Sequence, residues 1–232
     1  MKELLLNEFK GWKRLEVFWL VLACSVITGL SIYWGDTLMG IVSATTGVAC
    51  VICTGKGKLS AYLFGAINTL LYAIIAYQSK YYGEVMLNAL YYFPLQFYGF
   101  YVWKKNMNME THEVNKREMK PKTRIIMLLG VFALTGVYGF ILNTLGGNLP
   151  YVDALSTVVS VVAMIISIKM YTEQWILWII VDVVTVFMWG YAFFIQGSES
   201  IATLLMWIVY LLNAIFMYIK WKKESSSKEK EV

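Results

Sequence analysis

The chain has 232 residues, of which 59% are hydrophobic and only 15% charged, and its mean hydropathy is +0.59. So little polar surface cannot coat a soluble globule of this length, which excludes an ordinary soluble domain. A chain in lipid must satisfy its backbone hydrogen bonds internally, as a bundle of helices or as a β-barrel. A β-barrel would show ten-residue segments of alternating hydrophobicity, and none are visible. The composition therefore predicts an all-α integral membrane protein, with a modest net charge of +5.

Runs of about twenty apolar residues predict eight transmembrane helices. In chain order they fall near 15–34, 36–55, 58–78, 83–103, 123–143, 151–172, 174–195 and 199–221. The first run has no small-residue cleavage site after it, so we expect a spanning helix there and not a signal peptide. Pro121 and Pro150 stand just before helices, whereas Pro94 lies inside the fourth span. Pro94 therefore predicts a kink, either a hinge for gating or a packing kink.

The distribution of basic residues predicts the orientation. With the N-terminus inside, 19 of the 20 Lys and Arg residues fall on cytoplasmic segments, and Lys80 alone falls outside. An odd number of spans would scramble this pattern. We therefore expect both termini in the cytoplasm, the polar loop 104–122 on the same side, and a cytoplasmic tail at 222–232.

An internal repeat is also visible. Asp36 and Asp153 begin spans 117 residues apart, and each three-helix segment ends in Trp-Lys-Lys, at Trp103 and Trp221. Ser43 matches Ser160 at the same offset. One separating helix keeps the two triplets parallel, which predicts a 1+3+1+3 arrangement; the alternative is two unrelated apolar stretches. Parallel repeats occur in transporters that bind substrate near the midplane. The segments would be an extra N-terminal helix 15–34, a first three-helix bundle 36–103, the loop 104–122, a linker helix 123–143 and a second three-helix bundle 151–221.

Metal and cofactor chemistry has little support in the sequence. Cys50 and Cys53 have a spacing seen in redox and zinc sites, but there is no second pair. The single histidine, His112, lies in a polar loop. We expect Cys24, Cys50 and Cys53 to be apolar packing residues, and we expect no metal, cofactor or nucleic-acid partner.

The seventh span carries Trp175, Trp178, Asp182, Thr185 and Trp189 at steps of three and four residues, so they share one helical face. Asp182 is the one ionisable residue near the middle of any span. A carboxylate there faces a protein interior or a wet cavity. Two interpretations follow: an aspartate bonded to a neighbouring helix, or a cavity-lining acid flanked by indoles.

Amides and aromatic residues recur on the matching helices of both predicted repeats. The residues concerned are Asn68, Tyr72, Asn88, Tyr92, Gln96, Trp207, Tyr210 and Asn213. Any one of the amides is explained equally well as an interhelical hydrogen bond. Together they predict a cavity for a small, flat, polar and cationic solute, because indole and phenol faces attract cations.

Other functional classes are weakly supported. No phosphate-binding motif is present, so the chain is not expected to hydrolyse ATP. A membrane enzyme would need a catalytic cluster that the scattered carboxylates do not form, and we expect no catalytic residue. A scaffold or sensor would need a soluble partner-binding region longer than the loop 104–122. The sequence does not distinguish a monomer from a homo-oligomer.

Trp175-Ile-Leu-Trp178 followed by Asp182, the segment Asn88…Pro94…Tyr98-Gly99…Trp103 and the 1+3+1+3 layout together resemble the PnuC family of bacterial vitamin transporters. The resemblance covers residues 36–223 and implies a fold similar to SWEET sugar transporters. It implies uptake of nicotinamide riboside, an NAD precursor, across the inner membrane by facilitated diffusion, with a cytoplasmic kinase that traps the nucleoside by phosphorylation. Related members carry thiamine, riboflavin or deoxynucleosides, and thiamine is also cationic and aromatic.

Our hypothesis of a nicotinamide riboside facilitator gives roles to the residues of the predicted cavity. Trp175 and Trp178 would form part of an aromatic site, and Asp182 would orient its helix or balance the charge of the ligand. The polar and aromatic contacts would come from the fourth and eighth spans, and Asn68 would add an amide from the third. The residues expected on the fourth and eighth spans are Asn88, Tyr92, Gln96, Tyr210 and Asn213.

Overall fold

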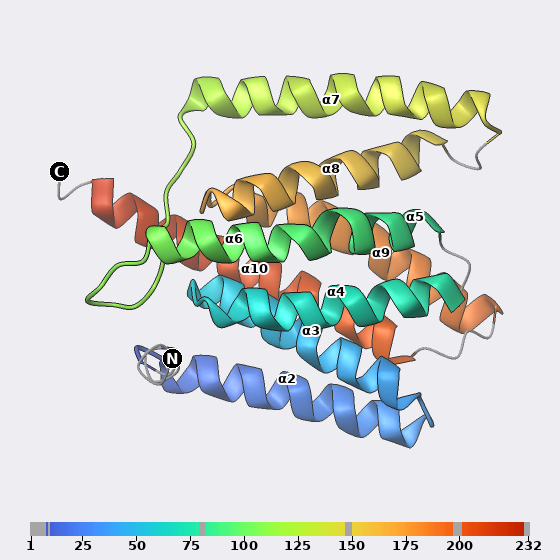
Figure 1. The fold of residues 1–232 in the computed structure, drawn as a ribbon, viewed down its shortest axis with the longest axis horizontal. Helices are drawn as coiled ribbons and strands as arrows, with labels where there is room; N and C mark the ends of the chain where they lie inside the picture. Colours follow the sequence, from blue (N-terminus) through green and yellow to red (C-terminus); the bar gives the residue numbers. More distant parts are fainter. Residues whose placement is uncertain (1–7, 9, 79–81, 147–149, 197–200, 230–232) are drawn as a thin grey trace. The chain divides into compact units, whose positions relative to one another are not determined.

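The computed structural model describes residues 8, 10–78, 82–146, 150–196 and 201–229 (Figure 1). Within these ranges the secondary structure is helical, with two isolated β-bridges and no strand. The elements are α2 (Arg14–Tyr33), α3 (Leu38–Lys56), α4 (Ser60–Gln78), α5 (Tyr82–Met86), η1 (Leu87–Tyr92), α6 (Phe93–Lys105), α7 (Pro121–Thr144), α8 (Pro150–Ile168), α9 (Gln174–Gln196) and α10 (Ile201–Glu229). Lys80, the predicted outside lysine, and residues 230–232 of the predicted tail lie outside the described ranges.

Seven of the helices in the described ranges are long and apolar enough to cross a membrane: α2, α3, α4, α7, α8, α9 and α10. The prediction of an all-helical, multi-pass membrane protein is confirmed. The predicted fourth span, 83–103, differs from the others because it is one helical run built of three pieces, α5, η1 and α6. The last helix also runs further than predicted, since α10 continues through the expected tail to Glu229.

The helix ends follow from local chemistry. The Thr37 hydroxyl caps the N-terminus of α3 by accepting a hydrogen bond from the Gly40 N–H at 3.0 Å. Gly57 ends the same helix in the left-handed conformation, at φ 81°, where a glycine meets no steric penalty. Pro121 and Pro150 are the first residues of α7 and α8, where a missing N–H costs nothing.

The run α5–η1–α6, which we call the fourth segment, changes its backbone hydrogen-bonding pattern just before Pro94. Leu87–Tyr92 form a π-helical turn in which the Phe93 N–H donates to the Asn88 carbonyl, five residues earlier. Pro94 has no N–H to offer the Leu90 carbonyl, so regular α-helical bonding is interrupted here. π-Turns of this kind are frequent at functional sites.

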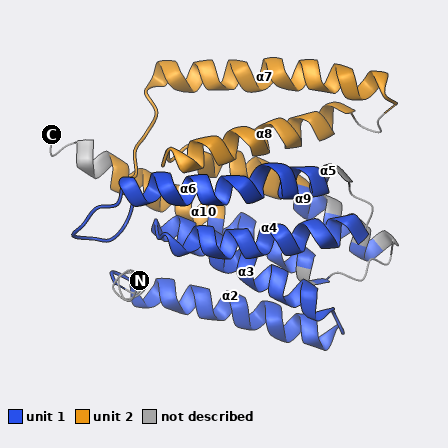
Figure 2. Cartoon of the chain, viewed as in Figure 1, with its two compact units in different colours: residues 1–115, 185–213 blue, residues 116–184, 214–232 orange. Residues whose placement is uncertain are grey.

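The chain divides into two compact units, each discontinuous in sequence (Figure 2). The first unit comprises residues 1–115 and 185–213, and the second comprises 116–184 and 214–232. The buried centre of the first unit is formed by α2, α3 and α4, together with the parts of α9 and α10 that lie within residues 185–213. Its buried hydrophobic residues are Ala23, Ile27, Ala44, Val48, Ile52, Tyr72, Trp189, Ile201, Leu204 and Met206.

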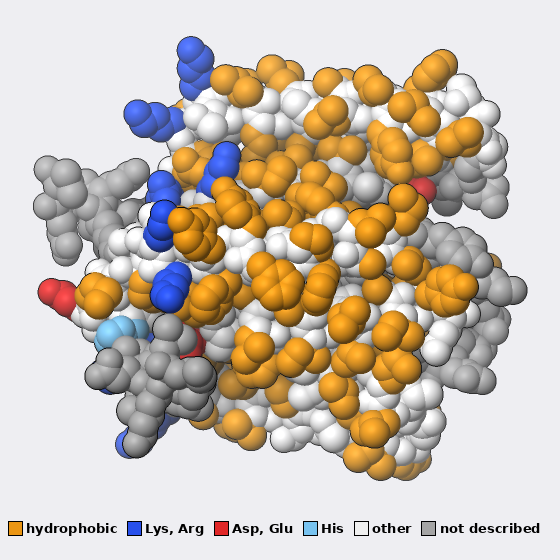
Figure 3. All heavy atoms as spheres, viewed as in Figure 1, with side chains coloured by type: hydrophobic (Ala, Val, Ile, Leu, Met, Phe, Trp, Pro, Cys, Tyr) orange, Lys and Arg blue, Asp and Glu red, His pale blue; other side chains and the backbone are white. Residues whose placement is uncertain are grey.

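Helix α7 of the second unit exposes most of its apolar side chains. Phe132 is 81% exposed and Leu129 is 64% exposed. Figure 3 shows hydrophobic side chains along the length of this helix and basic side chains at its beginning, where the sequence has Lys122 and Arg124. An apolar surface of this extent is stable in contact with lipid and not with water.

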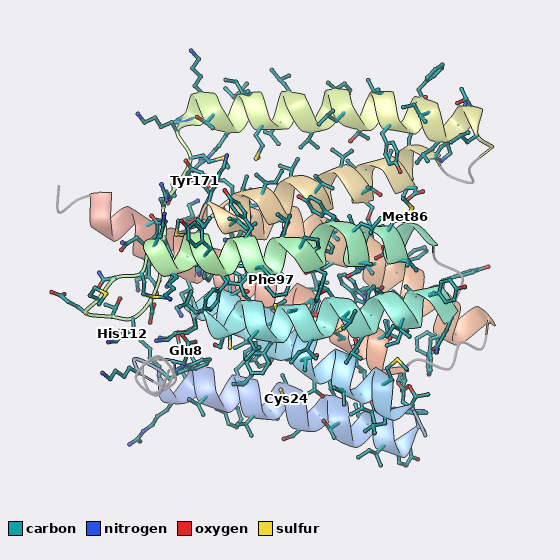
Figure 4. The ribbon with its side chains drawn as sticks, viewed as in Figure 1. Glu8, Cys24, Met86, Phe97, His112 and Tyr171 are labelled. Atoms are coloured by element: carbon teal, nitrogen blue, oxygen red, sulfur yellow. The ribbon has the colours of Figure 1, made fainter. Side chains whose placement is uncertain are left out.

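Ion pairs and hydrogen bonds fix the α3–α4 turn of the first unit. Lys56 Nζ lies 2.8 Å from Glu16 of α2 and 2.9 Å from Glu113 of the polar loop. Lys58 Nζ donates to the carbonyl of His112 at 2.9 Å. Burial lowers the pKa of Lys58, and the nearby Glu113 opposes this shift. His112 and Glu8 are labelled at the same end of this unit in Figure 4.

The second half of the polar loop is held within the second unit. The Arg117 N–H donates to the Met170 carbonyl at 3.2 Å, and the Thr172 N–H donates to the Arg117 carbonyl at 2.9 Å. Glu173 accepts from Arg124 Nε at 2.5 Å and from the Met119 N–H at 3.1 Å. The segment predicted as an ordinary polar loop is therefore fixed by specific hydrogen bonds.

Candidate functional site

The centre of the first unit contains a group of polar and aromatic side chains from α3, α4 and the adjoining parts of α9 and α10. We call it the polar–aromatic cluster. Its members are Ser43, Asn68, Tyr72, Trp189, Met206, Trp207 and Tyr210. Polar groups grouped inside a membrane-spanning bundle are expensive to bury and therefore mark candidate binding sites.

Asn68 is the hub of the hydrogen bonds in this cluster. Its Nδ2 donates to the Ser43 carbonyl at 2.9 Å and lies 3.6 Å from Met206 Sδ. The Tyr210 hydroxyl donates to Asn68 Oδ1 at 3.5 Å, which is the limit of a hydrogen bond. Asn68 as a whole residue is half-buried.

Four aromatic rings follow one another across the same region. Trp189 Nε1 donates to the Tyr72 hydroxyl at 3.2 Å. The Tyr72 ring meets Trp189 and Trp207 edge to face, with centroids 6.4 and 6.1 Å apart. Trp207 in turn meets Tyr210 at 5.1 Å. These separations are in the range of favourable aromatic pairs, so the rings support one another in fixed orientations.

Two buried polar atoms on α10 have no hydrogen-bond partner among the described residues: Trp207 Nε1 and Asn213 Oδ1. The other amide atom of Asn213 is engaged, because Nδ2 donates to the Val51 carbonyl of α3 at 3.0 Å. A buried donor or acceptor without a partner costs about 1–3 kcal/mol. Such atoms are candidates to bind the polar groups of a ligand.

The predicted site residues of the fourth segment differ in their burial and in their contacts. Gln96 is buried against α4, where a Cβ added to Gly65 would overlap its carboxamide. Asn88 uses its amide inside its own segment, donating to the Glu84 carbonyl at 2.9 Å. Tyr92 is half-buried and Pro94 is exposed. Gln96 therefore packs its polar group against a neighbouring helix of this unit.

The remaining predicted residues belong to the first half of α9, in the second unit. Trp175 is 2% exposed and packs edge to face on Trp221, with centroids 5.6 Å apart. Asp182 is also 2% exposed. Trp178 is half-buried, and is therefore the more accessible of the two predicted tryptophans.

Of the predicted site residues, the structure brings Asn68 and Tyr210 together directly. Tyr72, Trp189 and Trp207 join them; the sequence analysis placed these three on the predicted cavity-lining faces without giving them an individual binding role. A signal for them existed, because Asn68 and Tyr72 are four residues apart and Trp207 and Tyr210 are three apart, the spacings of a shared helical face. No metal-binding group of three or more His, Cys, Asp or Glu side chains occurs among the described residues.

Comparison with known proteins gives consistent results. Residues 37–223 match the family model described as nicotinamide mononucleotide transporter. The chain is 40% identical to the nicotinamide riboside transporter PnuC of Neisseria mucosa, over 93% of this chain and 83% of that protein. It is 33% identical to the protein of the same name from Haemophilus influenzae, over 92% of each chain.

Among solved structures, the chain is similar to the crystal structure of the vitamin B3 transporter PnuC. The TM-score is 0.87 at 39% sequence identity, and the match covers 95% of this chain and 96% of the other. These relatives are named as transporters and not as enzymes. The family model spans far more than half of the sequence, and the fold is shared across nearly all of it. This chain therefore belongs to the PnuC family of bacterial membrane transporters.

Proposed function

We propose that this chain carries nicotinamide riboside across the bacterial inner membrane by facilitated diffusion. The observation that carries the proposal is the similarity of nearly the whole chain to two proteins named nicotinamide riboside transporters. The polar–aromatic cluster supports it because its chemistry suits such a ligand. Nicotinamide riboside combines a cationic pyridinium ring, a carboxamide and ribose hydroxyls.

The first unit offers complementary groups for each part of this ligand. The faces of Tyr72, Trp189 and Trp207 would attract the pyridinium, at about 0.5–2 kcal/mol for each cation–π contact. The long hydrogen bond between Tyr210 and Asn68 would open to accept ribose hydroxyls. Trp207 Nε1 and Asn213 Oδ1 would supply a donor and an acceptor, since neither has a partner among the described residues.

Three residues of α9 have supporting roles in this proposal. Asp182 would balance the ligand's positive charge or orient its helix. Trp178, which is half-buried, would offer an aromatic ring to the ligand, while Trp175, already packed on Trp221, would hold the helix end. In the fourth segment Gln96, Asn88 and Tyr92 would add polar contacts, and the π-turn before Pro94 would act as the hinge for gating.

Transport would need no energy source of its own. A cytoplasmic kinase would phosphorylate the nucleoside on arrival, and the added charge of about −1.5 to −2 would prevent its return through the carrier. The proposed orientation, with both termini inside, is supported because it puts 19 of the 20 basic residues on cytoplasmic segments. The 1+3+1+3 arrangement gains support from one similarity: the turns after α3 and after α8 both contain a left-handed residue, Gly57 and Met170.

The choice of substrate is tested by calorimetric titration of the purified protein with nicotinamide riboside, thiamine, riboflavin and a deoxynucleoside. We expect saturable binding of nicotinamide riboside and weaker or absent binding of the others. Preferential binding of thiamine would replace the proposed substrate by another cationic aromatic vitamin. Trp178→Ala and Asp182→Asn test the roles assigned to α9, and unchanged binding in both variants would remove that helix from the site.

A further inference from the structure

Gly47, in the middle of α3, lies next to the Asn68 and Tyr210 side chains of the polar–aromatic cluster. A Cβ added to it would overlap the hydroxyl oxygen of Tyr210. The same Cβ would lie 2.7 Å from Asn68 Nδ2 and 2.9 Å from Met206 Sδ. Three side chains from two other helices of the first unit, α4 and α10, therefore converge on the space that a side chain at position 47 would fill.

Close neighbours are not general among the helical glycines, although Gly65, Gly99 and Gly139 also have them. A Cβ added to Gly29 of α2, or to Gly130 or Gly136 of α7, would meet nothing within 4 Å. Glycine in the middle of a helix is less favourable than alanine, because it has more conformational freedom to lose on folding. At Gly47 this disadvantage is accompanied by a close approach of polar groups that alanine would prevent.

The approach matters for the geometry of the candidate site. The Tyr210 hydroxyl reaches Asn68 Oδ1 only because it sits over the bare backbone of Gly47. Moving the hydroxyl would also move the Tyr210 ring, which meets Trp207, and Trp207 meets Tyr72. Any side chain at position 47 would therefore displace the hydrogen-bonded hub first and the aromatic rings after it.

We propose that Gly47 is a positioning residue that sets the distance between Tyr210 and Asn68 and thereby the shape of the substrate site. The inference rests on the proposed function for its substrate, nicotinamide riboside, but its steric content does not depend on which solute is carried. Of the three atoms that a Cβ would meet, the Tyr210 hydroxyl oxygen would overlap it most, so Tyr210→Phe removes the largest conflict while keeping the ring.

The test is a double-mutant cycle with Gly47→Ala and Tyr210→Phe, measured by titration with nicotinamide riboside and by thermal unfolding of the purified protein. Gly29→Ala is the matched control, because it changes the same residue type in a helix where the Cβ meets nothing. We expect Gly47→Ala to weaken nicotinamide riboside binding by about tenfold, since overpacking forces side chains from their positions. In the presence of Tyr210→Phe the same change should cost less than about threefold.

Equal binding by Gly47→Ala and the wild type would overturn the proposal, and so would an equal loss from Gly47→Ala in both backgrounds. If Gly47→Ala does not accumulate as folded protein, recovery of folded protein in the double variant supports the proposal and continued failure overturns it. If the wild type does not bind nicotinamide riboside, the proposed function fails. The unfolding temperatures of the four proteins then still test the steric coupling between positions 47 and 210.

Discussion

Replacing Asn68 by leucine keeps the volume of the side chain and removes its hydrogen bonds. In the structure only one of these is short, the 2.9 Å bond to the Ser43 carbonyl, while the contacts to Tyr210 and Met206 are 3.5 and 3.6 Å long. Interhelical hydrogen bonds in membrane proteins average about 0.6 kcal/mol. Asn68→Leu should therefore destabilise the fold only slightly and lower its melting temperature by about 2 °C.

Substrate binding should suffer more than stability does. Losing one hydrogen bond to a neutral ligand group costs about 0.5–1.5 kcal/mol, which corresponds to about a 2- to 12-fold rise in the dissociation constant. Titration of the purified variant with nicotinamide riboside measures this rise, and a thermal unfolding scan on the same sample measures the stability. Asn143→Leu, at an exposed position near the end of α7, is the control for adding an apolar side chain. An unchanged dissociation constant in a well-folded Asn68→Leu variant would refute the assignment of Asn68 to the site.

Two further changes test other parts of the molecule. Lys56→Met removes both ion pairs that connect the α3–α4 turn to α2 and to the polar loop, and it leaves two carboxylates partly buried. We expect the free energy of unfolding to fall by about 2 kcal/mol. The control Lys104→Met, at an exposed position, should cause no comparable loss. Pro94→Ala restores an N–H for the Leu90 carbonyl, so the π-turn should relax toward regular α-helix. We expect slower uptake into liposomes with unchanged substrate affinity, and a parallel loss of both would argue against a hinge.

Much of the fold follows from the sequence because lipid imposes a simple rule. Seven predicted spans correspond to single helices, since twenty consecutive apolar residues can satisfy their backbone in lipid only as a helix. The fourth span shows the limit of that rule. Pro94 predicts a break in helical bonding, but the π-turn that precedes it depends on how the Asn88 carbonyl is satisfied.

The end of α10 shows a second limit of prediction from hydropathy. A hydropathy pattern marks the boundary of the lipid and not the end of the helix. Residues after Trp221 are polar, yet they continue the helix to Glu229. Part of the reason is tertiary, because the Ser225 hydroxyl donates to Glu118 of the polar loop at 2.8 Å.

The candidate site was predictable only as a set of helical faces. Spacing along α4 and α10 indicated Asn68 and Tyr210, but it could not show that their side chains meet. That meeting depends on a glycine in a third helix, Gly47, which no periodicity marks as special. Asn88 illustrates the opposite case, since a predicted ligand-facing amide donates to its own helix.

The central claim, passive carriage of nicotinamide riboside, is tested most directly by its distribution across a liposome membrane at equilibrium. Purified protein is reconstituted, radiolabelled nicotinamide riboside is added outside, and the internal concentration is followed with and without an imposed sodium or proton gradient. The account predicts an inside-to-outside ratio that rises to one and stays there under every gradient. A ratio that exceeds one and follows either ion gradient would contradict facilitated diffusion.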